Sequence, residues 1–399
     1  MNEYHVSLQP ESLMTHMKAI CKGIGPRPSA SEKEKQAADY VEKTVRQFGI
    51  TNIERQLFKT QNSPGWIEIP CLMAGLFGIA FAMVGGLWGK WIGSILLLSS
   101  ALVFQRFLFV IPPFFNKLIT RWSSQNVIVK VPAANQAQRT IYLAGHLDSQ
   151  KQRFQFPPSP FWMMKIQTSL TVVAGIIGSI LLLVDILSNH PTSLYWLALL
   201  GFLYLYGLLS LIYDETQPHV EGANDNATAI SVLLAMAQAL RDQPLQTTDV
   251  VLLFTGSEEA GCTGMESYLK QYSPSKENTF WIDIEMVGTG NLCYITRHGV
   301  SYLSTYLPHP DMVAFAEQTA HKNPHLRVTG KDMVIIEEVA NLWEKDYKAI
   351  CIAGYNTDGV LPNWHRLSDN LSNIEPATLS RAAFYVWMLM QEIDRSNSS

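Results

Sequence analysis

Four long apolar segments, arranged in two pairs, limit what this chain can fold into more than any other feature. They comprise residues 69–89, 91–113, 166–184 and 191–213. Each has about the 20 residues that a helix needs to cross a hydrocarbon layer of roughly 30 Å. Short turns, Gly89-Lys90 and residues 187–190, separate the members of each pair. Helices buried in a large soluble core are the alternative, but the pairing favours two hairpins in an integral membrane protein with four transmembrane helices.

The Lys and Arg residues near the hairpins predict which compartment the soluble segments face. Each hairpin crosses the membrane twice, so the chain returns to the side from which it entered. The basic residues that flank the hairpins on this side are Lys117, Arg121, Lys151, Arg153 and Lys165. The far turns carry Lys90 and Asp185. Because cytoplasmic loops carry an excess of Lys and Arg, we expect both termini and the soluble part in the cytoplasm, with the lipid bilayer as a partner.

Composition narrows the remaining function classes. The formal net charge is −4 and the pI is near 6.2, so the chain lacks the basic footprint of a nucleic-acid-binding protein. Its five cysteines are Cys21, Cys71, Cys262, Cys293 and Cys351. Without CxxC or Cys/His spacing, they indicate neither a disulfide framework nor a thiolate zinc site, and they suit a reducing compartment. The N-terminus shows no basic region followed by an apolar stretch, so we expect no cleaved signal peptide.

The segments outside the hairpins predict one large α/β domain. We assign residues 1–66, 122–160 and 214–399 to this domain, and residues 67–121 and 161–213 to the hairpins. Apolar or β-branched runs predict strands at 126–131, 140–144, 249–255, 279–286 and 349–353. Helical spacing predicts helices at 31–48, 228–240, 264–272 and 376–393. Because strands and helices alternate, we expect a mainly parallel mixed sheet sandwiched by helices, with its site at the carboxyl ends of the strands.

Histidine and acidic residues follow the predicted strands or begin a helix. His146 and Asp148 come after the strand at 140–144, and residues two apart in an extended segment point to the same face. His146 can then bind a metal while Asp148 orients it, although a surface His–Asp pair is the alternative. Asp225 lies in a Gly/Asn-rich turn that enters a helix, where a simple N-cap is the alternative.

Two adjacent acids provide the strongest indication of a cation. Glu258 and Glu259 follow a strongly apolar strand, where two like charges are costly unless a cation neutralises them. His365, after Trp364 in a late loop, would be an ordinary loop histidine if taken by itself. Histidine and carboxylate side chains together are the ligands that zinc uses, so the residues predict a zinc site at the ends of the strands.

Six stretches of the soluble part resemble a known family and occur in its order. They read GPRPSASEKEKQAADYVEKTVRQFG, IYLAGHLDS, GANDNATA, VLLFTGSEEAGCTGMESYL, IDIEMVG and WHRLSDNLSNIEP. The family is that of the co-catalytic zinc aminopeptidases of the bacterial leucyl aminopeptidase and glutamate carboxypeptidase II type, whose fold glutaminyl cyclases share. The resemblance covers nearly all of the soluble part and implies a zinc aminopeptidase-like (phosphorylase/hydrolase-like) fold. The hairpins have no counterpart in the soluble family members.

The resemblance also implies two zinc ions and the residues that bind them. The implied ligands are His146, Asp225, Glu259, Glu285 and His365. His146 and His365 correspond to ligands of different ions, and Asp225 corresponds to the residue that bridges both. The chain departs from the family at Glu285, where an Asp is usual, and Asp283 is the alternative ligand.

Two further residues take catalytic roles by resemblance. Asp148 matches the acid that orients His146, and Glu258 matches the general base. In such a site, two zinc ions about 3.5–4 Å apart lower the pKa of a bridging water and polarise a carbonyl oxygen. The base takes a proton from this water and returns it to the leaving amine.

The resemblance therefore predicts a membrane-bound aminopeptidase that hydrolyses peptides with a free N-terminus. A glutaminyl-peptide cyclotransferase, which needs one zinc, is the first alternative. The GANDNAT stretch at 222–228 is closer to the peptidase form of this turn than to the cyclase form. A catalytically inactive binding or scaffold module is the second alternative, against which the retained ligands count. Residues 355–359 are a candidate pocket loop or a plain turn, and the position of the hairpins suggests that they present hydrophobic peptides to the site. Substrate preference and oligomeric state stay open.

Overall fold

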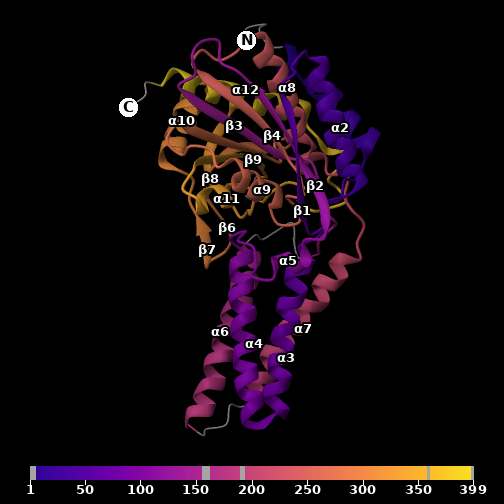
Figure 1. The fold of residues 1–399 in the computed structure, drawn as a ribbon, viewed down its shortest axis with the longest axis vertical. Coiled ribbons are helices and arrows are strands. Elements are labelled where there is room, and N and C mark those ends of the chain that lie inside the picture. Colours follow the sequence, from indigo (N-terminus) through magenta and orange to yellow (C-terminus); the bar gives the residue numbers. More distant parts are fainter. Residues whose placement is uncertain (1–5, 155–161, 189–193, 357–359, 397–399) are drawn as a thin grey trace.

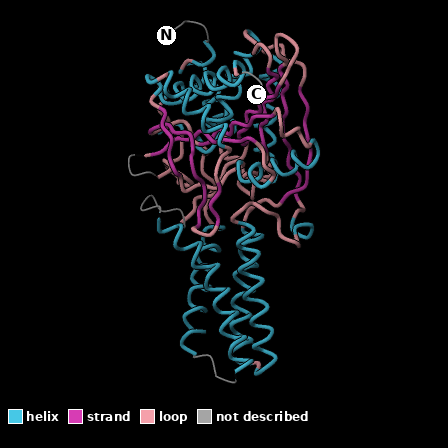
Figure 2. Tube along the Cα trace, turned by 90° about the vertical axis from the view of Figure 1, so that its left-hand side faces the viewer, coloured by secondary structure: helices cyan, strands magenta, loops and turns pink. Residues whose placement is uncertain are grey.

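The protein consists of an α/β domain and a bundle of long helices that projects from one end of it (Figure 1). The computed structural model describes residues 6–154, 162–188, 194–356 and 360–396. Seen from the side in Figure 2, the strands lie within the α/β domain and the long helices extend away from it. Residues 189 and 190 of the predicted far turn, and residues 357–359 of the candidate pocket loop, lie outside the described residues.

One nine-stranded mixed sheet forms the centre of the α/β domain in the described part of the chain. Its strands are β1 (Ile53–Thr60), β2 (Trp122–Val131), β3 (Arg139–His146), β4 (Thr248–Thr255), β5 (Thr279–Glu285), β6 (Asn291–Ser301), β7 (Ser304–Tyr306), β8 (Val328–Asp332) and β9 (Lys348–Tyr355). The strand order is β1-β2-β4-β3-β5-β9-β6-β7, and β8 pairs with β6.

The sheet is parallel at its centre and mixed at its edges. β4, β3, β5 and β9 are parallel neighbours. Toward one edge, β2 pairs antiparallel with β4 and with β1. Toward the other edge, β6 pairs antiparallel with β9 and β7 and parallel with β8. The α/β class and the helix-covered mixed sheet are thus confirmed, and the central parallel strands β4, β3 and β5 are those that end at or just before candidate ligands.

Helices cover both faces of the sheet. One face carries α1 (Pro10–Lys18), α2 (Glu32–Gln47), α8 (Thr228–Asp242), α10 (Pro310–Lys322) and α12 (Pro376–Arg395). The other face carries α9 (Thr263–Tyr272) and α11 (Val339–Glu344). The start of α2 illustrates the local cause: the Ser31 side chain accepts the N–H of Glu34 as an N-cap, and Ala38, Val41 and Val45 then face the core at helical spacing.

Several elements were not predicted from the sequence. They are β1, β6, β7, β8, α1, α10, α11, the short α5 (Asn116–Ile119) and the helical turns η1 (Val6–Leu8), η2 (Ala19–Ile24), η3 (Ala223–Ala227), η4 (Pro324–Leu326) and η5 (Leu371–Asn373). β1 shows why: its sequence IERQLFKT is mostly polar and exposed at the sheet edge, so it lacks the apolar run of a buried strand.

Among the described residues, four helices are long and apolar enough to cross a membrane: α3 (Gly65–Val84), α4 (Gly86–Phe107), α6 (Trp162–Ser188) and α7 (Leu194–Glu215). In α7 the qualifying stretch is Tyr195–Glu215. Their outer faces expose large apolar side chains, including Phe77, Ile95, Ile180 and Phe202. Small residues let the helices approach closely: an added Cβ at Gly75 would lie 2.1 Å from the Tyr204 ring.

The turn of the first hairpin differs from the prediction. α3 ends at Val84 and α4 begins at Gly86, so the turn lies at Gly85-Gly86 and not at Gly89-Lys90. Gly86 has φ +57°, which glycine adopts without steric cost. Lys90 consequently lies within α4, where its Nζ is 2.9 Å from Oδ1 of Asp185 on α6. The two charges at the far end of the bundle therefore neutralise each other.

Candidate metal centre

The candidate ligands meet at one edge of the parallel strands. His146 ends β3, Glu285 ends β5, and Glu258 and Glu259 follow β4. Asp225 lies in η3, directly before α8. Because parallel strands point their carboxyl ends to the same edge, residues that lie far apart in the sequence converge there. His365 reaches them from the loop after β9, and its side chain is 8% exposed.

The Asp225 carboxylate lies between the two histidines. Its Oδ1 is 3.1 Å from Nε2 of His146, and its Oδ2 is 3.4 Å from Nε2 of His365. On the first side, Oε1 of Glu285 is 3.3 Å from Nε2 of His146. On the second side, Oε2 of Glu259 is 3.2 Å from Nε2 of His365. Two three-residue groups thus share Asp225, and a cis peptide bond joins this residue to Asn226.

The donor set fits a divalent metal. In each group, His146–Asp225–Glu285 and Asp225–Glu259–His365, the donor atoms all lie within 4.8 Å of one another. Both groups are buried, and Oε1 of Glu259 has no hydrogen-bond partner among the described residues. Nitrogen and carboxylate oxygen ligands suit zinc. Bringing several carboxylates into one buried site is costly without a cation, so these residues can hold one metal in each group.

The pKa shifts follow from the crowding of charge. Burial raises the pKa of Glu285 to about 8, although His146 opposes the shift. Burial and the nearby Asp225 raise the pKa of Glu259. Burial alone would lower the pKa of His365, but Glu259 and Asp225 raise it to about 9. Burial would raise the pKa of Asp225, but the two histidines lower it. The cluster therefore binds protons that a metal would displace.

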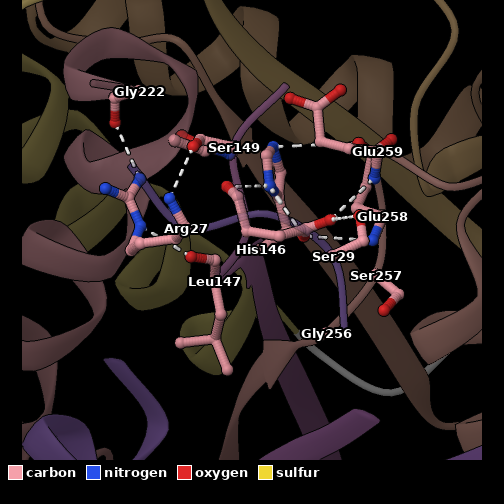
Figure 3. A network of polar contacts seen from close by, with 12 residues as sticks. Arg27, Ser29, His146, Leu147, Ser149, Gly222, Gly256, Ser257, Glu258 and Glu259 are labelled. Atoms are coloured by element: carbon pink, nitrogen blue, oxygen red, sulfur yellow. Dashed lines mark hydrogen bonds and ion pairs between the residues drawn. The ribbon is translucent and has the colours of Figure 1, made fainter. Parts of the chain in front are cut away.

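Asp148 connects His146 to the loop that carries the two glutamates. Its Oδ1 is 3.4 Å from Nδ1 of His146 and accepts the backbone N–H of Glu258 at 3.1 Å. Its Oδ2 accepts the backbone N–H of Glu259 at 3.1 Å and the Ser29 hydroxyl at 2.5 Å. Figure 3 shows Ser29, Glu258 and Glu259 near His146. The Asp148 carboxylate thus lies beside the His146 ring and holds the backbone of the glutamate loop.

Glu258 lies beside the first group of ligands. Its Oε2 is 3.9 Å from Nε2 of His146, longer than the distances within the two groups that share Asp225. The Cys262 thiol donates to Oε1 at 3.1 Å. Burial raises the pKa of Glu258 well above its ordinary value. A carboxyl group with a raised pKa binds a proton more readily than an ordinary carboxyl group, which suits a general base.

The two candidate acids of β5 lie in different surroundings. Glu285 contacts His146, whereas Asp283 lies deeper along the strand, with Glu337 and Cys351 as its neighbours. Both side chains are on the same face of the strand, as their spacing requires. The position of the strand end relative to His146 therefore favours Glu285 as the ligand.

Arg27 is a supporting residue that the sequence did not reveal. Its Nε donates to the carbonyl oxygen of Leu147 at 2.8 Å, and its Nη2 donates to that of Gly222 at 2.8 Å. Arg27 thereby ties the end of β3 to the turn before Asp225 (Figure 3). Gly222 has φ +63°, and an added Cβ would lie 2.4 Å from that of Ser149, so no side chain fits there.

Asp369 and Asn226 are two further supporting residues that were missed. Asp369 accepts the backbone N–H of Asn224 at 2.6 Å and that of Asp225 at 3.1 Å. Asn226 Nδ2 donates to Oε2 of Glu285 at 2.7 Å. The only sequence signal was their position, Asn226 next to Asp225 and Asp369 within the WHRLSDN stretch. Their roles depend on contacts that local sequence does not specify.

The candidate ligands border a cavity of about 150 Å³. Asp225, Glu258, Glu259, Glu285 and His365 line one part of it. The membrane-candidate helices line another part, through Glu68 of α3, Phe104 and Phe107 of α4, Met164 of α6 and Leu211 of α7. The membrane-candidate helices thus contribute directly to the wall of the site.

Residues 210–390 match the model of Peptidase family M28. A leucine aminopeptidase precursor from Bacteroides thetaiotaomicron is 15% identical, with a TM-score of 0.55 over 96% of this chain and 97% of that chain. BSAP, a zinc aminopeptidase from Bacillus subtilis, is 13% identical, with a TM-score of 0.57 over 98% and 97%. A glutaminyl cyclase from Bacteroides thetaiotaomicron is 15% identical, with a TM-score of 0.56 over 96% and 98%. No protein of curated function matches the chain. The matches confirm the predicted resemblance to the zinc aminopeptidase and glutaminyl cyclase superfamily, and the structural similarities confirm the fold.

Proposed function

We propose that this protein is a membrane-anchored zinc aminopeptidase that removes N-terminal residues from peptides. The observation that carries the proposal is the position of Asp225, whose two carboxylate oxygens face His146 and His365 on opposite sides. Glu285 completes one group of ligands and Glu259 completes the other. The match to Peptidase family M28 supports a hydrolase of this class.

Each group would hold one zinc ion. His146, Asp225 and Glu285 would bind the first, and Asp225, Glu259 and His365 the second. Zinc in such a site supplies a Lewis acid that polarises the substrate carbonyl and makes water more acidic. The carboxylate-rich environment compensates for the charge of the ions, and Asn226 holds the second oxygen of Glu285 in place.

Glu258 would move the proton during hydrolysis. Oε2 accepts a proton from the attacking water and then delivers it to the nitrogen of the leaving amine as the carbon–nitrogen bond breaks. The raised pKa of Glu258, caused by burial, suits a group that both accepts and donates. Asp148 keeps the loop in position through the backbone N–H groups of Glu258 and Glu259.

The proposed zinc site favours a free N-terminus. Zinc would balance the charge of Asp225, Glu259 and Glu285, which line the cavity, and it could take the nitrogen of a free α-amine as a further ligand. Arg153 also lines the cavity, but its Nη1 forms an ion pair with Glu215 at 2.9 Å. The amide nitrogen of an N-acetylated peptide is a poor zinc ligand, so such a peptide should be a poor substrate.

Cyclisation of an N-terminal glutamine is the second candidate, because glutaminyl cyclases have a similar fold. A cyclase needs one zinc, since the attacking group is the α-amine of the substrate itself. The presence of a second complete group of ligands, with His146 and Glu285, favours hydrolysis.

Incubation of the purified protein with unblocked, N-acetylated and N-terminal glutamine peptides distinguishes the two reactions. We expect a free amino acid from unblocked peptides and none from the N-acetylated ones. Chelation should abolish this release and zinc should restore it. Pyroglutamyl product without release of any amino acid would overturn the choice of hydrolysis.

We also propose that the α/β domain faces the cytoplasm. The basic residues Lys117, Arg121, Lys151, Arg153 and Lys165 lie at or near the domain end of the four helices. The ion pair of Lys90 with Asp185 leaves no net charge from these two residues at the far end. The positive-inside rule then supports this orientation.

A further inference from the structure

A second cavity lies between two of the membrane-candidate helices, close to the first. It has a volume of about 340 Å³. Its walls include Leu170 and Thr171 of α6 and Leu203 and Tyr206 of α7. We call this cavity the α6/α7 groove. α6 packs mainly against α4, and α7 mainly against α3, so α6 and α7 make few contacts with each other (Figure 1). This arrangement leaves room for the groove.

Gln167 lies at the boundary between the groove and the catalytic cavity. This residue lines both, so the two cavities are neighbours. The Gln167 amide forms no hydrogen bond with the described residues, and the side chain is partly buried. It is a polar group at a boundary: carboxylates lie in the catalytic cavity on one side, and a mostly apolar groove lies on the other.

The surroundings of the groove restrict its occupant. Ile166 and Leu170 of α6 line the groove and are exposed. The outer face of α6 is apolar, so in a bilayer the groove would be surrounded by hydrocarbon. An extended peptide would bring backbone N–H and C=O groups into this environment without partners, at several kcal/mol for each group. An alkyl chain has no such groups. A water molecule occupies about 30 Å³ in the liquid and a methylene group is of similar size, so the groove holds on the order of ten carbon atoms.

From this geometry we infer that the substrate is an α-aminoacyl amide of a single long alkyl chain, which extends from the catalytic cavity into the α6/α7 groove. The inference rests on the proposed function and specifies its substrate class. The α-amine lies in the catalytic cavity beside the proposed ligands, on one side of the amide carbonyl. The alkyl chain is attached to the amide nitrogen on the other side, so it leaves with the amine. Gln167 is placed to bind the polar amide between the two ends.

The reaction remains an amide hydrolysis. Water adds to the carbonyl carbon, and the carbon–nitrogen bond breaks. The products are a free α-amino acid and an alkylamine, and Glu258 carries the proton from the water to the amine nitrogen. The amino acid can leave into water, whereas the alkylamine returns to the bilayer along the groove through which its chain entered.

A series of leucine amides tests the inference in detergent-purified, zinc-loaded protein at a fixed detergent concentration. The amides carry ethyl, butyl, octyl or dodecyl chains, and release of leucine is measured. We expect kcat/KM to rise by about threefold to fourfold per methylene, the factor for burying one such group, until the chain fills the groove. A flat series would overturn the inference while leaving the aminopeptidase intact. If neither the ethylamide nor short unblocked peptides were hydrolysed, the proposed function itself would be rejected.

Matched variants distinguish binding of the alkyl chain in the groove from partitioning of the substrate into detergent. Thr171→Trp and Leu203→Trp fill the groove from its two walls. Ile180→Trp and Phe202→Trp are on the same helices, 53% and 64% exposed, and do not line the groove. We expect the first pair to lower the ratio of octyl to ethyl kcat/KM at least tenfold and the second pair to leave it unchanged. Equal ratios in all four variants would overturn the inference.

A binding experiment without turnover completes the test. Metal-free protein is irradiated with a dodecylamine that carries a diazirine at the tail, and the labelled peptides are identified by mass spectrometry. We expect labels at 162–174 and 203–207, reduced in Thr171→Trp. Equal labelling around Ile180 would contradict a specific groove. A leucyl peptide with a membrane-inserted helix, assayed in parallel, would overturn the choice of an alkyl chain if it were cleaved faster than every alkylamide.

Discussion

Replacement of Glu258 by glutamine separates proton transfer from metal binding. The change conserves the shape of the side chain and removes its negative charge. The glutamine oxygen can still accept the Cys262 thiol, which donates to Oε1 at 3.1 Å in the native protein. The backbone N–H of residue 258 keeps its bond to Asp148. We therefore expect Glu258→Gln to fold normally and to keep the glutamate loop in position.

The expected effect on turnover is large because an amide oxygen does not accept the proton of water. A general base contributes about 10²–10⁴-fold to the rate, so kcat should fall by this factor, equivalent to a barrier higher by roughly 3–5 kcal/mol. Metal binding should change little. Oε2 of Glu258 is 3.9 Å from Nε2 of His146, whereas Oε2 of Glu259 is 3.2 Å from Nε2 of His365 within a ligand group.

The assay combines kcat on an amino-acid arylamide with the zinc content of the same preparation, measured by elemental mass spectrometry. Glu259→Gln is the matched control: it makes the same chemical change at the next residue and should lower zinc content. Near-normal kcat in zinc-loaded Glu258→Gln would refute the assignment of Glu258 as base. Loss of zinc from Glu258→Gln would show that Glu258 is a ligand.

Three further predictions concern the metals, pH and topology. Asp225→Asn should lower zinc content in both groups, because its carboxylate faces both, whereas Glu285→Gln should affect one; zinc per chain checks this. Burial lowers the pKa of His16 to about 4 from 6.5, so the unfolded chain binds a proton that the folded chain does not. The contribution of His16 to the free energy of unfolding should therefore be fully present above pH 6.5 and should fall by up to about 3 kcal/mol as the pH approaches 4. Denaturant unfolding at several pH values should show a weaker pH dependence for His16→Gln. Leu87→Cys, exposed beside the far turn, should react with an impermeant maleimide in intact cells, and Lys33→Cys only after permeabilisation; the reverse pattern would contradict a cytoplasmic domain.

Structural features that depend on neighbouring residues in the chain could be predicted from the sequence. The spans of about 20 apolar residues depend on length and composition alone, and all four appear as long helices. The central strands and the helices α2, α8, α9 and α12 also agree with their local patterns. The position of the turn in the first hairpin could not be read in this way, because the glycines at 85 and 86 lie within an apolar run that continues on both sides.

By itself, the sequence determined the class of the fold, the four apolar spans and the chemical types of residue available for a metal. Only the tertiary structure decided which of them meet. It brings Glu285 next to His146 and leaves Asp283 with Glu337, although strand periodicity treats both acids alike. It also recruits Arg27, whose Nη1 binds the carbonyl of Glu221 across 194 residues of sequence. The physical reason is that local patterns report which face of a strand or helix is buried, whereas a site depends on contacts between distant segments. The α6/α7 groove also depends on tertiary contacts, because it forms where α6 packs against α4 and α7 packs against α3.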